Sequence, residues 1–179
     1  MEKSVLDELY AIRVFDKIKG PLISALQFSE NEIINHFAHI TDIDINEAIR
    51  TRIRNEKMIR KLFIQKGGHP KTEYALYFAV GYHVLDFFVE AFEHPAYIKI
   101  PLSYFKEKPV SFLYGSPYIS FFRRDRHKTA QKVFRYDELE QVIIQHGIDV
   151  EYDEKKSCIE MHLWDPSAVQ EYHQFYYEV

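Results

Sequence analysis

The stretch "DINEAIRTRIRNEKMIRKLFIQKGG", residues 44–68, is the longest periodic segment of the chain. On a helical wheel its apolar residues fall within one broad stripe, and the basic residues lie largely outside it. Thr41 with Asp44 can cap the start, and Gly67 with Gly68 provides a left-handed stop. The pattern predicts a long helix with a basic outer surface, whose apolar stripe consists of Ile45, Ala48, Ile49, Ile53, Ile59 and Phe63.

Shorter helices are predicted on both sides of this segment. Ser4 with Asp7 can cap a first helix, in which Val5, Leu9, Ile12 and Phe15 recur at helical spacing until Gly20. "SENE" at 29–32 is a second capping signal, and the segment 33–40 after it fits either a short helix or a strand. Further helices are predicted over 84–92 and over 138–146, the latter ended by Gly147.

Strand patterns dominate the later part of the chain. Alternation or β-branched and aromatic content predicts strands over 74–80, 97–102, 110–122 (broken by Gly115 and Pro117), 132–136 and 157–164. In the last of these, Ile159, Met161 and Leu163 share one face, and Cys158, Glu160, His162 and Trp164 share the other. The order predicts an α+β fold with N-terminal helices followed by a mainly antiparallel mixed sheet, in a single domain over 1–179.

Composition indicates a packed globular protein. Hydrophobic residues make up 46% of the 179 residues, while 6 Gly and 7 Pro leave little room for linkers. One cysteine excludes an internal disulfide framework. The acidic N-terminus does not fit an export signal, and no run without Asp, Glu, Lys or Arg, such as 74–85, reaches the roughly 18 apolar residues of a membrane span. A cytoplasmic protein without membrane contact is expected.

Charge is distributed unevenly along the chain. Residues 50–71 contain eight Lys or Arg against one acid, and residues 123–135 contain six against one. Residues 137–179 instead contain eleven acids and two lysines. The two basic clusters indicate either a polyanionic partner such as nucleic acid or a solvated surface that the acidic part balances.

Three segments resemble ADP-ribosyltransferase-like proteins of the DarT kind, which modify DNA: "AHITDIDINEAI" (38–49), "VSFLYGSPYISFF" (110–122) and "CIEMHLWDP" (158–166). The resemblance implies NAD as cofactor and a nucleic acid or protein as target. Where the family segment has an arginine just before its Ser-Pro pair, this chain has Gly115.

The resemblance also implies residue roles. His39 would hydrogen-bond NAD, together with Thr41, Tyr114 and Ser116 as cofactor-binding residues. Tyr77 would stack on nicotinamide. Glu160 would stabilise the positive charge that develops on the ribose as nicotinamide leaves, a role that requires an anion. His39, Tyr77 and Glu160 are therefore the candidate catalytic residues.

Two other readings start from the same residues. "HIT" (39–41) and "HKT" (127–129) are two His-x-Thr pairs, which phosphoesterases of the two-histidine type use as acid and base. Alternatively, residues 29–66 and the glycine pair after them form a winged helix, in which the phosphate contacts are Arg50, Arg52, Arg54 and Lys57.

Two further hypotheses concern binding. The loop "FFRRDRHK" (121–128) places a second group of cations after aromatic residues, an arrangement that can hold a nucleic-acid backbone; the cations are Arg123, Arg124, Arg126 and Lys128. A protein without catalytic activity, such as an inhibitor or adaptor from a mobile element, fits the composition equally. No metal site is expected, because His36 and His39 lack a third ligand at suitable spacing, and nothing near Cys158 makes it a nucleophile.

Overall fold

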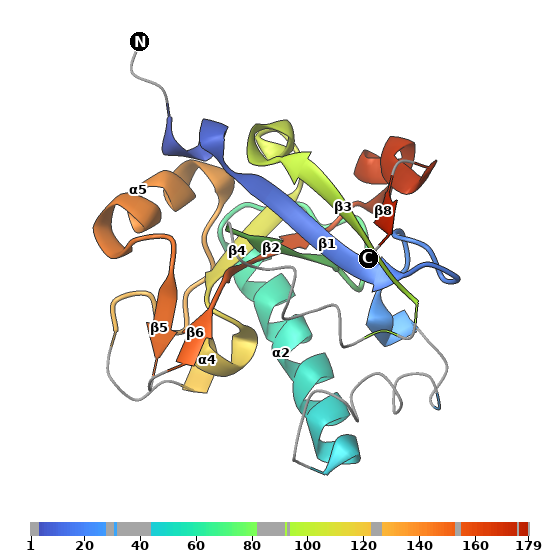
Figure 1. Cartoon of the computed structure of the whole chain (residues 1–179). Helices are drawn as coiled ribbons and strands as arrows, with labels where there is room; N and C mark the ends of the chain where they lie inside the picture. Colours follow the sequence, from blue (N-terminus) through green and yellow to red (C-terminus); the bar gives the residue numbers. More distant parts are fainter. Residues whose placement is uncertain are drawn as a thin grey trace.

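The computed structural model describes residues 4–27, 31, 44–81, 92, 94–122, 127–152, 155–174 and 176–178. Figure 1 shows a sheet with helices packed around it. Its elements, in chain order, are η1 (Val5–Glu8), β1 (Tyr10–Asp16), η2 (Ala25–Gln27), α2 (Ile45–Gln65), β2 (Leu76–Val80), β3 (Pro95–Pro101), η3 (Leu102–Phe105), β4 (Val110–Tyr114), α4 (Pro117–Phe122), α5 (Tyr136–His146), β5 (Val150–Tyr152), β6 (Lys155–Ser157), β7 (Ile159–Leu163), η4 (Pro166–Gln174) and β8 (Tyr177–Glu178).

Six strands form one sheet in the order β4-β7-β2-β1-β3-β8. Every neighbouring pair is antiparallel, and β5 pairs with β6 in a separate hairpin. The strands next to one another in the sheet are mostly far apart in sequence, so the sheet joins the beginning and the end of the chain. The predicted α+β class with a mainly antiparallel sheet is confirmed.

The two faces of the sheet differ in chemistry. One face is apolar and packs against η1, η3 and α5, with Phe78, Ile98, Phe112 and Met161 among its buried residues. The other face lies under α2, where Ile59 and Phe63 of the helix meet Trp164 in a second, smaller apolar cluster. Phe63 and Trp164 stack with ring centroids 6.3 Å apart.

The predicted N-terminal helix is wrong, since only η1 is helical there and β1 follows it. β1 lies inside the sheet between β2 and β3, so Ala11, Ile12 and Phe15 are buried although they point to different faces. A strand buried on both faces has a nearly continuous apolar sequence, which also matches helical spacing. The longest helix, α2, therefore is not N-terminal but follows β1 in the chain.

Arg13 is the exception in this apolar strand. Its guanidinium donates to the backbone carbonyls of Pro21 at 2.8 Å, Ile23 at 2.8 Å and Tyr77 at 3.0 Å. Burial lowers the pKa of Arg13 to about 10. These bonds attach the turn after β1 to β2.

Two predicted strands are also wrong. Residues 117–122 form α4 rather than continuing β4, because Pro117 at the first helical position lacks only an N–H that would have no helical partner. Residues 132–136 contribute an isolated bridge, in which Phe134 exchanges backbone hydrogen bonds with Phe112 at 2.8 and 2.9 Å. The predicted helix over 84–92 lies outside the described residues, apart from Phe92, and so does the segment 33–40.

The helix predicted from 44–68 is confirmed. The side chain of Asp44 accepts from the backbone N–H of Glu47 at 3.0 Å and caps the start. At the end, Gly67 has φ +82° and the N–H of Gly68 donates to the carbonyl of Phe63 at 2.9 Å, as in a Schellman motif. The winged-helix interpretation is wrong, because its recognition helix is part of this continuous helix and Leu76–Val80 is an interior strand.

The close approach of Gly68 to Phe63 gives a test of this helix end. A Cβ at Gly68 would overlap the Phe63 ring, whereas a Cβ at Gly67 would meet nothing within 4 Å. We expect Gly68→Ala to lower the free energy of unfolding by about 1 to 3 kcal/mol, as overpacking does. In a Phe63→Leu background the same change should cost clearly less, because the ring is gone. Urea denaturation of the four proteins measures this coupling, and additive costs would contradict the contact.

Candidate functional site

Charged and polar side chains gather between α2 and the strands β2, β7 and β4. The helix turns Arg52 and Glu56, one helical turn apart, toward the sheet. Cross-strand neighbours face them, since Tyr77 lies opposite His162 and His162 lies opposite Ser111. We call this group the inner polar cluster; its members are Arg52, Glu56, Tyr77, Ser111, Glu160 and His162.

Glu56 connects the helix to β2. It is 1% exposed, and its carboxylate accepts from the backbone N–H of Ala75 at 2.6 Å and from the hydroxyl of Tyr77. Burial raises the pKa of Glu56, although the hydrogen bonds from Tyr77 and Ala75 and the charge of Arg52 oppose this effect. Burial also raises the pKa of Tyr77 well above 10, so its hydroxyl stays protonated at neutral pH and donates the hydrogen bond to Glu56.

A chain of hydrogen bonds crosses β4 and β7. His162 lies between two partners, with Nε2 2.8 Å from the Glu160 carboxylate and Nδ1 3.2 Å from Ser111 Oγ. Ser111 Oγ also accepts from Trp164 Nε1 at 2.9 Å. The chain is satisfied throughout when Ser111 donates to Nδ1 and the Nε2–H of His162 donates to Glu160.

Arg52 joins the two halves of the cluster. Its guanidinium carbon lies 3.9 Å from the centroid of the Tyr77 ring, and Nη2 lies 3.6 Å from a carboxylate oxygen of Glu160. Burial alone would raise the pKa of Glu160, but the charge of Arg52 and the hydrogen bond from His162 outweigh it, so this pKa is lowered. Glu160 is therefore an anion at neutral pH despite being only 8% exposed.

The order Ser111, His162 and Glu160 has the connectivity of a nucleophile, a base and an orienting acid. Catalysis would require a reacting carbonyl to approach Ser111 Oγ, yet Ser111 and His162 are both fully buried. In addition, Trp164 Nε1 donates a hydrogen bond to Ser111 Oγ, the oxygen that would have to react. As arranged, these side chains attach α2 to the sheet and do not form a hydrolytic site.

Of the three candidate catalytic residues, Tyr77 and Glu160 come together in the inner polar cluster, and Arg52 contacts both. His39 and Thr41 lie outside the described residues. Tyr114, assigned to cofactor binding, lies on the opposite face of the sheet, where its hydroxyl donates to the carbonyl of His146 at 2.6 Å. Alternation along β4 therefore turns Tyr114 away from Glu160, and the structure does not bring the two together. Ser116 follows that strand and directly precedes α4.

The resemblance implies NAD between Tyr77 and Glu160, and these residues as placed do not fit it. The Tyr77 hydroxyl binds Glu56, its ring is covered by Arg52, and Glu160 already has His162 and Arg52 as partners. NAD could reach them only if these contacts were broken. NAD binding and transferase activity stay predictions.

Sequence reasoning did not select Glu56, Ser111 or His162 for this cluster. Two signals were present: Glu56 is the one acid among the eight cations of residues 50–71, and alternation places His162 on the Glu160 side of its strand. Ser111 had no comparable signal, because its position opposite His162 depends on strand pairing.

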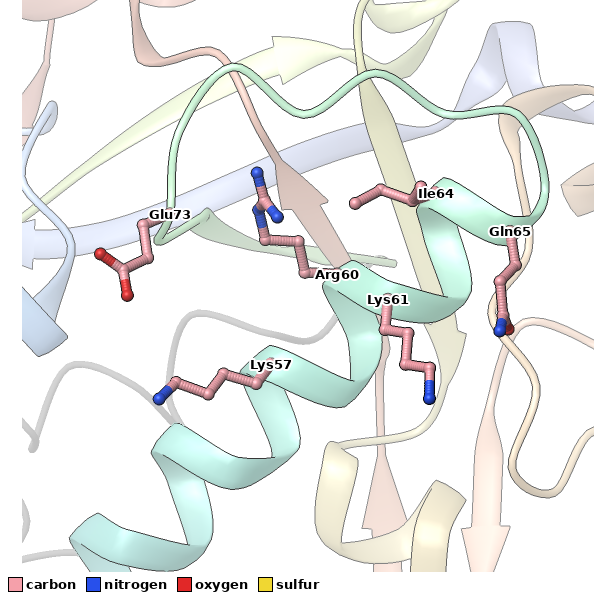
Figure 2. Close-up of a pocket in the computed structure, with 6 residues that line it drawn as sticks. All are labelled: Lys57, Arg60, Lys61, Ile64, Gln65 and Glu73. Atoms are coloured by element: carbon pink, nitrogen blue, oxygen red, sulfur yellow. The ribbon is translucent and has the colours of Figure 1, made fainter.

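The basic residues of α2 separate into two groups. The prediction that Arg52 contacts nucleic acid is wrong, since its side chain is only 22% exposed and is turned into the inner polar cluster. Arg50 and Arg54 are exposed, as are Lys57 and Lys61. Figure 2 shows Lys57 and Lys61 projecting from α2 beside an open groove of about 510 Å³, which is also lined by Arg60, Ile64, Gln65 and Glu73.

Other predicted residues are placed as follows. Lys128 is exposed, whereas Arg123, Arg124 and Arg126 lie outside the described residues. His127 hydrogen-bonds Thr129 of its own pair at 2.6 Å, and the second pair, His39 with Thr41, is not described.

Burial raises the pKa of Cys158 to about 12, so its thiol stays protonated at neutral pH.

Within the described ranges, no three His, Cys, Asp or Glu side chains are arranged to hold a metal ion. None of the helices described there has both the length and the apolar character that a membrane span requires. No protein-family model, curated protein or solved structure matches this chain.

Glu56 is the first residue through which the cluster can be tested. Glu56→Ala leaves the N–H of Ala75 and the hydroxyl of Tyr77 without their acceptor, which should cost about 2 to 4 kcal/mol of unfolding free energy. Glu56→Gln keeps an acceptor and should cost less than half as much. Urea denaturation at neutral pH measures both, with the exposed Glu73→Ala as control. Equal losses for Ala and Gln would contradict the role of these hydrogen bonds.

The opposite pKa shifts of the two buried acids give a pH test. Because the pKa of Glu160 is lowered from 4.5, its carboxylate stabilises the fold above that pH, and the contribution is lost as the pH falls through the lower folded-state value. The stability difference between wild type and Glu160→Gln should therefore shrink on acidification.

Glu56 should behave in the opposite way. Its pKa is raised, so the contribution of its protonated form is present below 4.5 and is lost as the pH rises through the folded-state value. Urea denaturation from neutral pH to about pH 3 compares each glutamine variant with wild type. Differences that change in parallel for the two residues would contradict these shifts.

Proposed function

We propose that the protein binds nucleic acid through the outward surface of α2. The observation that carries this proposal is a line of four exposed cations along one side of the helix, which we call the outer basic stripe: Arg50, Arg54, Lys57 and Lys61. Their spacing of four, three and four residues places them within an arc of about 60° at 3.6 residues per turn.

The stripe has dimensions that suit a phosphate backbone. From Arg50 to Lys61 the helix rises about 16 Å at 1.5 Å per residue. One strand of a duplex carries a phosphate about every 3.4 Å along this length, so all four cations can meet phosphates of one strand. Arg60 lies beside the stripe, where its Nε donates to the carbonyl of Thr72 at 3.1 Å.

Charge pairing among the described residues does not neutralise the stripe. Lys66 is paired with Glu138 at 2.7 Å and Lys71 with Asp165 at 2.7 Å, so both belong to the internal ion pairs of the fold. For the four stripe residues, by contrast, the described part of the chain provides no ion-pair partner. Unpaired cations on a fixed helix attract a polyanion.

The inner polar cluster supports binding rather than catalysis. Arg52 and Glu56 hold α2 on the sheet, which keeps the stripe pointing outward in a fixed row. Cations carried by a fixed helix require less ordering of the backbone on binding than cations of a mobile loop would. A cytoplasmic location and a role as an inhibitor or adaptor are compatible with this proposal and stay predictions.

Two lysines of the stripe provide the test. In Lys57→Ala/Lys61→Ala, affinity for a labelled DNA duplex of about 20 base pairs should fall, and the dependence of log affinity on log salt should become shallower by about 1.8, since each phosphate contact contributes about 0.9. Fluorescence anisotropy over a salt series measures both quantities.

The matched control is Lys106→Ala/Lys132→Ala, which removes the same charge from exposed positions outside α2. It should leave the salt dependence close to that of wild type. If the control weakens binding as much as the stripe variant, net charge rather than the stripe is responsible. If the wild type does not bind the duplex or the corresponding single strand, the proposed function is wrong.

A further inference from the structure

We infer that the half of the sheet beside α2, formed by β1, β3 and β8, stacks the unpaired bases of a single-stranded nucleic acid. This inference rests on the proposed function, and it specifies the form of nucleic acid bound. The surface, which we call the open aromatic face, is made by Tyr10, Tyr97, Lys99 and Tyr177.

Strand register places these residues on the α2 side of the sheet. Ile12 lies opposite Ala79, and Ala79 lies opposite Glu160 of the inner polar cluster, so all three side chains point to the α2 side. Lys99 is opposite Ile12, and Tyr10 shares that side of β1 by alternation. Tyr97 follows the same alternation on β3 and is opposite Tyr177 of β8.

Among the described residues, helix α2 packs on the other half of this side. Its apolar cluster there includes Ala75, Leu113 and Trp164, and its polar side chains bond to residues of β7 and to Ala75 just before β2. In Figure 1, β3 and β8 lie at the opposite edge of the sheet from β4. The reverse side of β3 is filled by the main core, including Ile98 and Ile100, so rings are presented to solvent only on the α2 side.

The tyrosines are arranged as two stacking points. Tyr177 is 57% exposed and stacks on Tyr97, with ring centroids 5.0 Å apart and an interplanar angle of 23°. Tyr10 is 39% exposed, and the ammonium of Lys99 lies 4.3 Å from its ring centroid. Each point therefore combines a ring backed by a neighbouring side chain with surface that a ligand can reach.

The chemistry of this face favours bases over an apolar partner. Aromatic rings accept any base, because every base offers a π-face, and a nearby cation attracts the phosphate that follows it. Lys99 supplies such a cation here, while Ile12 is buried and adds little apolar surface. Tyrosine hydroxyls also keep the unliganded face compatible with water.

The spacing of the two points fits one continuous strand. Tyr10 is opposite Pro101, four residues along β3 from Tyr97, which corresponds to about 14 Å at 3.4 Å per residue. Stacked nucleotides rise about 3.4 Å each, so this distance covers roughly four of them. A duplex cannot use these points, because its bases are already paired and stacked.

The experiment compares three probes of equal length, about 20 nucleotides: a single strand with bases, an abasic single strand with the same phosphates, and the duplex. DNA and RNA versions of the first probe test for a preference between the two sugars. The variants are Tyr177→Leu and Tyr10→Leu, with Tyr172→Leu as the matched control from η4, and urea denaturation verifies that each remains folded.

Wild type should bind the base-bearing strand more tightly than the abasic strand. Each of Tyr177→Leu and Tyr10→Leu should weaken binding of the base-bearing strand by about fivefold to a hundredfold, as loss of one stacked base does, without changing abasic or duplex binding. Tyr172→Leu should bind all three probes as wild type does.

The outcomes separate this inference from the proposed function. Equal wild-type affinity for base-bearing and abasic strands, or full affinity in both tyrosine variants, would overturn base stacking, while loss of affinity in Lys57→Ala/Lys61→Ala would still support the outer basic stripe. Base-dependent binding that survives the lysine changes would overturn the stripe and retain the open aromatic face. Failure of wild type to bind any probe would overturn both.

Discussion

The attachment of α2 to the sheet through buried charged groups determines the arrangement of the other surfaces. Burying Arg52, Glu56 and Glu160 is costly unless each finds partners, and here each one does. Such contacts are directional, and they add to the orientation that the apolar packing of Ile59 and Phe63 already gives the helix. The inner polar cluster therefore fixes which side of α2 faces the sheet and which side faces solvent.

Two surfaces follow from this attachment. The outward side of α2 carries the outer basic stripe, and the strands that α2 leaves uncovered carry the open aromatic face. Both surfaces come from one asymmetry, since α2 packs over β4, β7 and β2, whereas Tyr10, Lys99 and Tyr177 of β1, β3 and β8 are exposed on that side. A binding protein with a phosphate-contacting helix next to a base-stacking sheet is a coherent combination, because a nucleic acid offers both kinds of contact.

Local signals were reliable where one element could be read by itself. The Asp44 cap, the Gly67 stop and the periodicity between them were sufficient to predict α2, and alternation over 157–164 was sufficient for β7. They failed at β1 and α4. A strand buried on both faces loses its alternation, and the aromatic residues of 117–122 have strand propensity while Pro117 favours the start of a helix. Tyr77 and Glu160 were predicted to belong to one site, but their contacts with Glu56, Arg52 and His162 were not predicted.

The sequence by itself determined the class of fold, the limits of its longest helix and the faces of its clearest strands, because caps, stops and periodicity act between residues close in the chain. Only the tertiary structure decided which charged side chains are buried and paired and which are exposed. Arg50, Arg52 and Arg54 are alike in sequence, yet Arg52 alone of the three is turned toward Glu160. Strand order, set by pairing between distant segments, placed Glu160 beneath α2 and the exposed Tyr177 at the far edge of the sheet, and no local pattern carries that information.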